Sequence, residues 1–74
     1  MKQDEPFVIK AYWKSELAML YFPKASRETA LKRLNHWLRI NPRLRYLLNR
    51  NINDFTPKQV KQIVEEFGNP YEYQ

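Results

Sequence analysis

The sequence predicts an all-α domain, a compact bundle of about four short helices with an extended N-terminal arm. Three observations lead to this prediction: apolar residues recur at helical spacing, residues that cap helices stand before these segments, and prolines separate them. At 74 residues the chain has room for a single domain with a thin core. We expect the ordered core to cover residues 7–70, with the ends at 1–5 and 71–74 loose.

The N-terminal third is expected to hold an extended segment and a short helix. Residues 6–13 are rich in β-forming side chains, which is compatible with a short strand or with an extended arm packed on the helices. The first helix is expected over residues 15–21, because Ser15 can accept a hydrogen bond from a free N–H one turn further on. Pro23 ends this helix, since the residue before a proline disfavours helical geometry.

The longest helix is expected over residues 26–40, with Ser26 as its N-terminal cap. One face of this segment is apolar at helical spacing and is formed by Ala30, Leu31, Leu34, Trp37 and Leu38. Asn41 and Pro42 end the helix, and the same two residues can begin a third helix as its cap and first position. The core residues of that third helix would be Leu44, Leu47 and Leu48.

The fourth helix has the clearest start in the chain. Thr56 and Gln59 fit a capping box, in which each side chain accepts from the backbone N–H of the other residue. Phe55 and Val60 are placed to pack as a hydrophobic staple, and Gly68 stands where a left-handed C-terminal cap is expected. The complete expected core is Phe7 or Ile9 with Leu17, Leu20, Leu31, Leu34, Trp37, Leu38, Leu44, Leu47, Leu48, Val60, Ile63, Val64 and Phe67.

Positive charge is concentrated in the middle of the chain. The net charge is +5, but residues 24–50 carry eight cationic side chains and one acidic side chain, a net charge of +7. Residues 1–23 are neutral, and residues 51–74 carry a net charge of −2. This asymmetry indicates a polyanionic partner, with an ordinary solvated surface as the alternative.

Catalysis, metal binding and membrane insertion are not expected. The chain has no cysteine and a single histidine, His36, so it lacks the ligands of a structural metal. Only one glycine is present, which excludes a glycine-rich phosphate loop. A catalytic pair of Glu28 and His36 is not expected, because the two residues lie roughly 12 Å apart along a helix, too far for direct hydrogen bonding. The longest apolar run, residues 17–22, is too short to cross a membrane. We therefore expect a non-enzymatic cytoplasmic protein without cofactors.

A short helix followed by a basic helix is the plan of a helix-turn-helix, so the sequence predicts a DNA-binding module, an accessory or regulatory factor. Lys32, His36 and Arg39 lie in one stripe on the side of the helix opposite the leucines. Lys24, Ser26 and Arg27 stand at the start of the helix, where free N–H groups and the helix dipole favour a phosphate. Arginine and lysine suit guanine, and asparagine suits adenine. Backbone phosphates are the expected contacts of Arg43, Arg45 and Arg50. The expected DNA-binding set is Lys24, Ser26, Arg27, Thr29, Lys32, Arg33, Asn35, His36, Arg39, Arg43 and Arg45.

Other partners are compatible with the same residues. An acidic protein could bind the basic surface, with Tyr12 and Trp13 as an aromatic anchor. RNA shares the charge argument, but no aromatic-bearing sheet of the kind that stacks unpaired bases is evident, so DNA is favoured. A single domain of this size offers few contacts, which makes a homodimer or a partner protein a further expectation.

The segment from Ser15 to Leu38 resembles the helix-turn-helix of small bacterial excisionase-type and regulator domains. The resemblance lies in Ser15-Glu16-Leu17-Ala18, Ser26-Arg27-Glu28-Thr29-Ala30 and Trp37-Leu38. It implies a recognition helix that begins at Ser26. The connection from Ala18 to Ser26 is longer than in those domains and carries Phe22-Pro23 in place of the customary glycine, so it is closer to the turns of winged-helix variants.

The chain from Phe7 to Pro70 also resembles a small domain family of unknown function from Bacteroides-like gut bacteria. The stretches that carry this resemblance are Ile9-Lys10-Ala11-Tyr12, residues 14–23 and residues 55–60, together with Ile63, Val64 and Gly68. Trp13 stands where that family usually has glycine, so a local turn is expected to differ. Because the family has no assigned activity, the resemblance supports the fold and leaves the function open.

Overall fold

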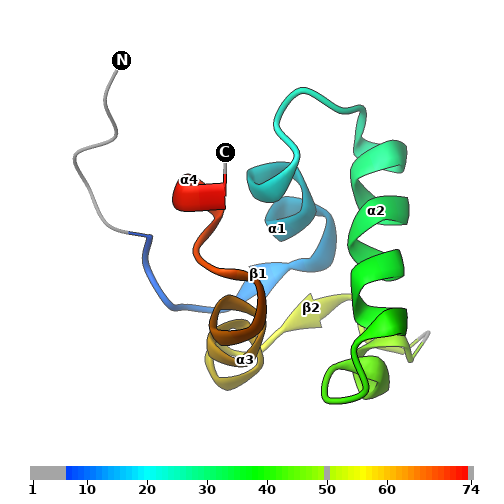
Figure 1. The fold of residues 1–74 in the computed structure, drawn as a ribbon, viewed down its shortest axis with the longest axis vertical. Helices are drawn as coiled ribbons and strands as arrows, with labels where there is room; N and C mark the ends of the chain where they lie inside the picture. The colour runs from blue at the N-terminus through cyan, green and yellow to red at the C-terminus, as the bar shows by residue number, and fades with distance from the viewer. Residues whose placement is uncertain (1–6, 50, 74) are drawn as a thin grey trace.

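The computed structural model describes residues 7–49 and 51–73. In chain order its elements are β1 (Tyr12–Trp13), α1 (Lys14–Tyr21), α2 (Arg27–Ile40), the 3-10 helix η1 (Arg45–Leu48), β2 (Asp54–Phe55), α3 (Pro57–Phe67) and the single-turn helix α4 (Pro70–Tyr73). Figure 1 shows α2 along the long axis of the molecule, with α1 beside it and α4 on the far side of α1. The radius of gyration is 11.7 Å, close to the roughly 11 Å of a compact chain of this length. The predicted loose segment 1–5 and Arg50 lie outside the described residues.

A two-stranded antiparallel sheet joins the two halves of the chain, so the predicted all-α class is correct only for the helical part. Tyr12 pairs with Phe55 and Trp13 with Asp54. The backbone N–H of Lys14 donates to the carbonyl of residue 53 at 2.8 Å and extends the ladder. The strand expected within residues 6–13 is therefore limited to Tyr12–Trp13, while Phe7 lies outside it and packs on the rings of Tyr12 and Tyr71, as expected of an arm. Its partner strand, Asp54–Phe55, was not predicted, because pairing between segments far apart in the chain leaves no local signal.

α1 begins at Lys14, one residue before the predicted start, and Ser15 is not its cap. Trp13 is extended because it belongs to β1, so the helix starts directly after the strand. The carboxylate of Glu16 accepts a hydrogen bond from the backbone N–H of Trp13 at 3.2 Å. Ser15 is therefore inside the first turn of the helix.

α2 agrees with its prediction at both ends. The hydroxyl of Ser26 accepts from the backbone N–H of Thr29 at 3.2 Å, so Ser26 caps the helix. The helix ends at Ile40, directly before Asn41 and Pro42. Its buried residues are Ala30, Leu34 and Leu38, while Leu31 and Trp37 are half-buried against the core.

The predicted third helix is wrong as an α-helix, because only the 3-10 helix η1 forms there. Asn41 still makes a cap-like contact, since its side-chain oxygen accepts from the backbone N–H of Arg43 at 2.9 Å. The N–H of Leu47 then donates to the carbonyl of Leu44, three residues back, at 2.9 Å. Side chains three residues apart eclipse in this tighter geometry, so Leu44 and Leu47 are both fully buried. Leu48 turns partly away and is half-buried.

α3 confirms the predicted capping box. The N–H of Gln59 donates to the hydroxyl of Thr56 at 3.2 Å, and the N–H of Thr56 donates to the side chain of Gln59 at 3.0 Å. Phe55 and Val60, the predicted staple, are both fully buried. Gly68 ends the helix with a φ of +87°, in the region that favours glycine.

The C-terminal segment folds back on the domain, which corrects the expectation of a loose end from residue 71. Residues 70–73 form α4, Pro70 is fully buried, and the ring of Tyr71 meets that of Phe7 edge-on at 5.9 Å. Residue 74 lies outside the described part of the chain.

The core is the predicted one with additions from the sheet and α1. Of the two alternatives for the N-terminal core residue, Phe7 is correct, because Phe7 is buried and Ile9 is exposed. Ala18, Tyr21 and Ala30, which the helical pattern turns inward, are buried as well. The further buried residues are Tyr12, Phe55 and Pro70. Some predicted members are half-buried at its edge, namely Leu20, Leu31, Trp37, Leu48, Val64 and Phe67. The core therefore lies between α1, α2, η1 and α3, and it fixes which face of α2 meets solvent.

Candidate nucleic-acid interface

The outer face of α2 is formed by Glu28, Lys32, His36 and Arg39, which are all exposed. Leu34, on the opposite side of the helix, is fully buried. Burial thus orients the three basic side chains of the predicted stripe toward solvent. Glu28 is the acidic residue of the helix and lies in its first turn, where a negative charge is favoured by the helix dipole.

The start of α2 carries four of the predicted residues, and two of them are engaged with each other. The hydroxyl of Ser26 donates to that of Thr29 at 3.0 Å while it also accepts from the backbone N–H of Thr29. Arg27 reaches back toward α1, with its guanidinium 3.5 Å from the hydroxyl of Ser15. Lys24 is exposed in the connection. Lys24 and Arg27 thus place positive charge at the end of the helix where backbone N–H groups are free.

Three hollows flank the outer face, and the predicted residues divide among them. On one flank, a hollow is lined by residues 21–26 with Thr29 and Arg33, and a smaller one beside it is lined by Phe22, Thr29, Lys32, Arg33, His36 and Trp37. The guanidinium of Arg33 lies over the ring of Phe22, 5.7 Å from its centroid, so this cation packs on α1. Cation–ring contacts of this kind orient an arginine without neutralising it.

The other flank is a larger groove of about 810 Å³ between α2, the start of α1 and the segment from η1 to β2. Its apolar floor is formed by the half-buried side chains of Leu31, Leu48 and Ile52. Trp13 stands at its rim with 64% of its surface exposed. Arg27 and Arg39 line it from α2, twelve residues apart on the helix. We call this feature the groove below.

Asn35 belongs to the groove rather than to the outer face. Among the residues that the structure describes, its side-chain oxygen is buried and has no hydrogen-bond partner. Buried polar atoms are nearly always paired in folded proteins, so this oxygen costs free energy where it stands. Direct reading of adenine needs both the oxygen and the nitrogen of an asparagine amide. The predicted role of Asn35 therefore suits its position less well than the roles of Lys32, His36 and Arg39.

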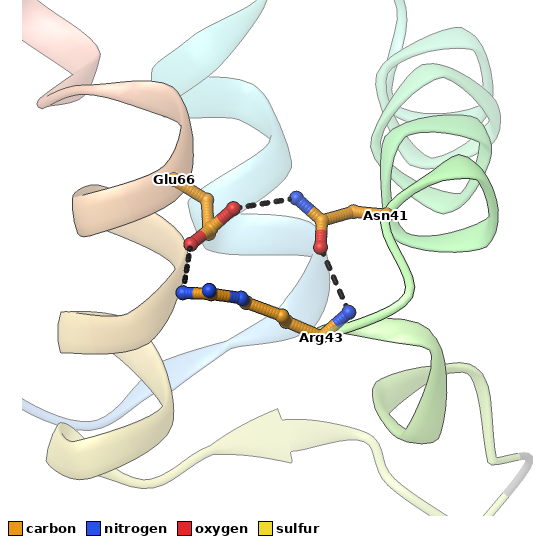
Figure 2. A network of polar contacts seen from close by, with 3 residues as sticks. All are labelled: Asn41, Arg43 and Glu66. Carbon is orange, nitrogen blue, oxygen red and sulfur yellow. Dashed lines mark hydrogen bonds and ion pairs between the residues drawn. The ribbon is translucent and has the colours of Figure 1, made fainter.

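The two arginines that follow α2 in the described part of the chain are tied to the fold while they stay exposed. Figure 2 shows the guanidinium of Arg43 beside the carboxylate of Glu66 on α3, at 3.6 Å. The same carboxylate accepts from the amide of Asn41 at 2.8 Å, and the oxygen of Asn41 accepts from the backbone of Arg43. Arg45 donates to the carbonyl of Arg39 at 3.2 Å and satisfies one of the last carbonyls of α2. Exposed ion pairs of this kind contribute about 0–1 kcal/mol, so Arg43 remains free to meet another anion.

With this geometry described, the chain can be compared with known proteins. The sequence pattern of a domain of unknown function, DUF4248, matches residues 8–70. The chain belongs to the DUF4248 family. The match runs from the segment before β1 to the first residue of α4, and it confirms the predicted membership of a small family of unknown function. Neither the curated proteins nor the solved structures contain a significant match.

Sequence reasoning missed the groove of this DUF4248 domain and grouped Tyr12 with Trp13 as one aromatic anchor. Tyr12 is buried, with its ring stacked on that of Phe7 at 5.3 Å, and Trp13 alone is exposed. Burial raises the pKa of Tyr12, and nearby Tyr71 and Glu16 add to this shift. Successive side chains of a strand point to opposite faces, which is the signal that separates the two aromatic residues.

Three further observations concern only the described part of the DUF4248 domain. No three residues among its histidines, aspartates and glutamates gather closely enough to hold a metal ion. None of its helices combines the length and the apolar character that a membrane span requires. Lys14, at the start of α1, is the cation whose pKa is lowered, and burial beside the groove is the cause.

Proposed function

We propose that this DUF4248 domain binds duplex DNA without catalysis, as an accessory or regulatory factor of helix-turn-helix type. The observation that carries the proposal is the arrangement of charge on one helix. Leu34 and Leu38 of α2 are buried in the core, and Lys32, His36 and Arg39 stand in a row on the opposite, exposed side. Two cations and a hydrogen-bonding imidazole on one exposed helix face suit the phosphates and base edges of a DNA groove.

The dimensions of α2 support its entry into the major groove. Its 14 residues span about 21 Å, and a helix with side chains is about 10–12 Å across, similar to the width of that groove. α1 packs on the inner side of α2 and leaves the outer face open. In this proposal α1 and α2 are the two helices of the motif, joined by the long connection at residues 22–26.

The proposed contacts fall into two classes. Base edges are assigned to Lys32, His36 and Arg39 on the outer face of α2. Backbone phosphates are assigned to the other exposed cations of the basic segment, namely Lys24, Arg27, Arg33, Arg43 and Arg45. One domain offers few such contacts, so useful affinity is expected from a second copy or a partner protein. A bacterial source and a cytoplasmic location belong to the same proposal.

A titration with random duplex DNA at two salt concentrations tests the proposal. Binding should weaken as salt rises, because each neutralised phosphate releases a counterion. Lys32→Ala should weaken binding, and Lys61→Ala is the matched control, since Lys61 is an exposed lysine on another helix, α3. Absence of binding at low salt, or equal losses in the two variants, would exclude α2 as the DNA-binding helix.

A protein partner is the second candidate function, favoured by one specific observation. Trp13 is a large aromatic side chain that is mostly exposed at the rim of a groove with an apolar floor. Exposed tryptophans beside apolar hollows often anchor protein interfaces. This candidate uses a different surface from the outer face of α2, so both functions are compatible in one domain.

A further inference from the structure

The groove beside α2 has the composition of a peptide-binding site. Its floor offers Leu31, Leu48 and Ile52, three aliphatic side chains that already pack on the core. Such a floor suits an apolar side chain of a partner better than a polar base, which would lose its hydrogen bonds to water there. Trp13, exposed at the rim, can cover a bound side chain with its ring.

The charge of the groove selects the occupant. Lys14, Arg27 and Arg39 line it with positive charge, and Glu16 is the acidic residue beside them. One carboxylate oxygen of Glu16 is already engaged by the backbone N–H of Trp13. The excess positive charge therefore favours an occupant that brings carboxylates, which guanidinium groups bind with two parallel hydrogen bonds.

The buried oxygen of Asn35 adds a preference for an occupant with N–H groups. Within the described residues it has no partner, and it lies in the wall between Arg27 and Arg39. The terminal torsion of an asparagine is broad, so a small rotation can expose the oxygen to a donor. The backbone of a peptide supplies such donors at regular intervals.

From these three features we propose that the groove binds a short acidic peptide segment of a partner protein. One apolar side chain of the peptide rests on the floor beneath Trp13, and flanking carboxylates pair with Arg27 and Arg39. The inference rests on the protein-partner candidate above and does not depend on DNA binding, because Trp13 and the floor lie outside the outer face of α2. The DNA proposal and the groove share Arg27 and Arg39, so the test is decided by Trp13, which belongs to the groove alone, and by Lys32, which belongs to the outer face alone.

Selection from a phage-displayed library of random peptides tests this assignment, with the intact domain as bait. The enriched peptides should carry acidic residues on both sides of an apolar residue. Their labelled synthetic forms are then titrated by fluorescence anisotropy against the wild type and variants. Trp13→Ala should weaken binding roughly tenfold or more, as loss of an interface anchor does. Arg27→Glu should weaken it comparably, while Lys32→Glu, the matched change on the outer face, should leave it within about twofold.

Three outcomes would overturn the assignment. The first is a selection without enrichment of acidic peptides. The second is an enriched peptide that binds the wild type and Trp13→Ala equally well. The third concerns nucleic acid: if Trp13→Ala weakens binding of single-stranded oligothymidine while peptide binding is unchanged, the groove holds unpaired bases instead. Because most of the Trp13 side chain is in solvent, Trp13→Ala should fold normally, and an unchanged melting curve verifies this.

Discussion

The phenol of Tyr21 donates a hydrogen bond to the carbonyl of Gly68 at 2.6 Å and thereby ties α1 to the end of α3. The two residues are 47 positions apart, and Tyr21 is almost fully buried. The carbonyl belongs to the glycine whose positive φ ends α3, so the contact holds the point at which the chain turns toward α4. The core behind α2 thus depends on a polar contact as well as on leucine packing.

Tyr21→Phe should lower the free energy of unfolding by about 1–2 kcal/mol, since it removes the hydrogen bond and keeps the ring. Urea denaturation of the two proteins measures the difference. Tyr46→Phe is the matched control, because Tyr46 is half exposed and its phenol contacts Gln62 at the surface. A change of about 0.5 kcal/mol or less is expected there. Equal changes in the free energy of unfolding of the two variants would mean that the buried hydrogen bond of Tyr21 stabilises the fold no more than an exposed one.

The same phenol makes stability depend on alkaline pH. Burial raises the pKa of Tyr21 above the ordinary value of 10.0, so the folded state holds this proton more tightly than the unfolded state. Stability from this group is therefore complete below pH 10 and falls as pH rises above it, where the unfolded phenol ionises. Thermal melts at neutral and alkaline pH should show a smaller alkaline loss for Tyr21→Phe than for the wild type. An identical loss in both proteins would contradict the assignment.

Asn35→Leu should raise the free energy of unfolding by roughly 1 kcal/mol, because it removes a buried oxygen that has no partner in the described residues. It should also weaken peptide binding in the groove, where we place that oxygen next to N–H donors. Denaturation curves and the peptide titration described above measure the two effects. A variant that is less stable than the wild type would mean that the amide is already satisfied in solution.

Alanine at Arg39, on α2, and alanine at Arg43, after α2, should change DNA binding in different ways. Arg43→Ala should weaken binding to all duplexes alike and make the slope of log affinity against log salt shallower by about 0.9. Arg39→Ala should cost roughly 1–3 kcal/mol on a preferred duplex and much less on random DNA. Titrations of both variants with a selected and a random duplex measure these effects. Equal losses on every sequence would make the surface a basic clamp that does not read bases, and no loss would leave it an ordinary solvated face.

Local signals predicted α2 and α3 well, while contacts between distant segments had to be seen in the structure. The caps at Ser26 and Thr56 lie within a turn of the N–H groups that they satisfy, so the residue types alone point to them. The pairing of Tyr12 with Phe55 joins segments far apart in the chain and changes the fold class without any nearby signal. For the same reason η1 was expected as an α-helix, since burial of Leu44 and Leu47 decides its geometry.

Of the two candidate surfaces, one could be predicted from local signals in the sequence and the other could not. The outer face of α2 follows from helical periodicity, because the leucines fix which side is buried. The groove could not be predicted, since its wall combines residues from α1, α2, η1 and the segment before β2. Asn35 and His36 are neighbours in sequence, yet one faces the groove and the other the solvent beside Phe22. Periodicity places the two residues about 100° apart around the helix axis, and the packing of the neighbouring elements decides what each of them meets.

Chemical-shift mapping of the backbone amides during titration with duplex DNA tests the central claim most directly. If α2 is the DNA-binding helix, the largest changes will fall on Lys32, His36 and Arg39, with smaller ones at the start of α2. Lys58 and Lys61 on α3 also carry charged side chains, and the chemical shifts of their amides should stay nearly unchanged. The largest changes on α3, or no changes at low salt, would contradict the account.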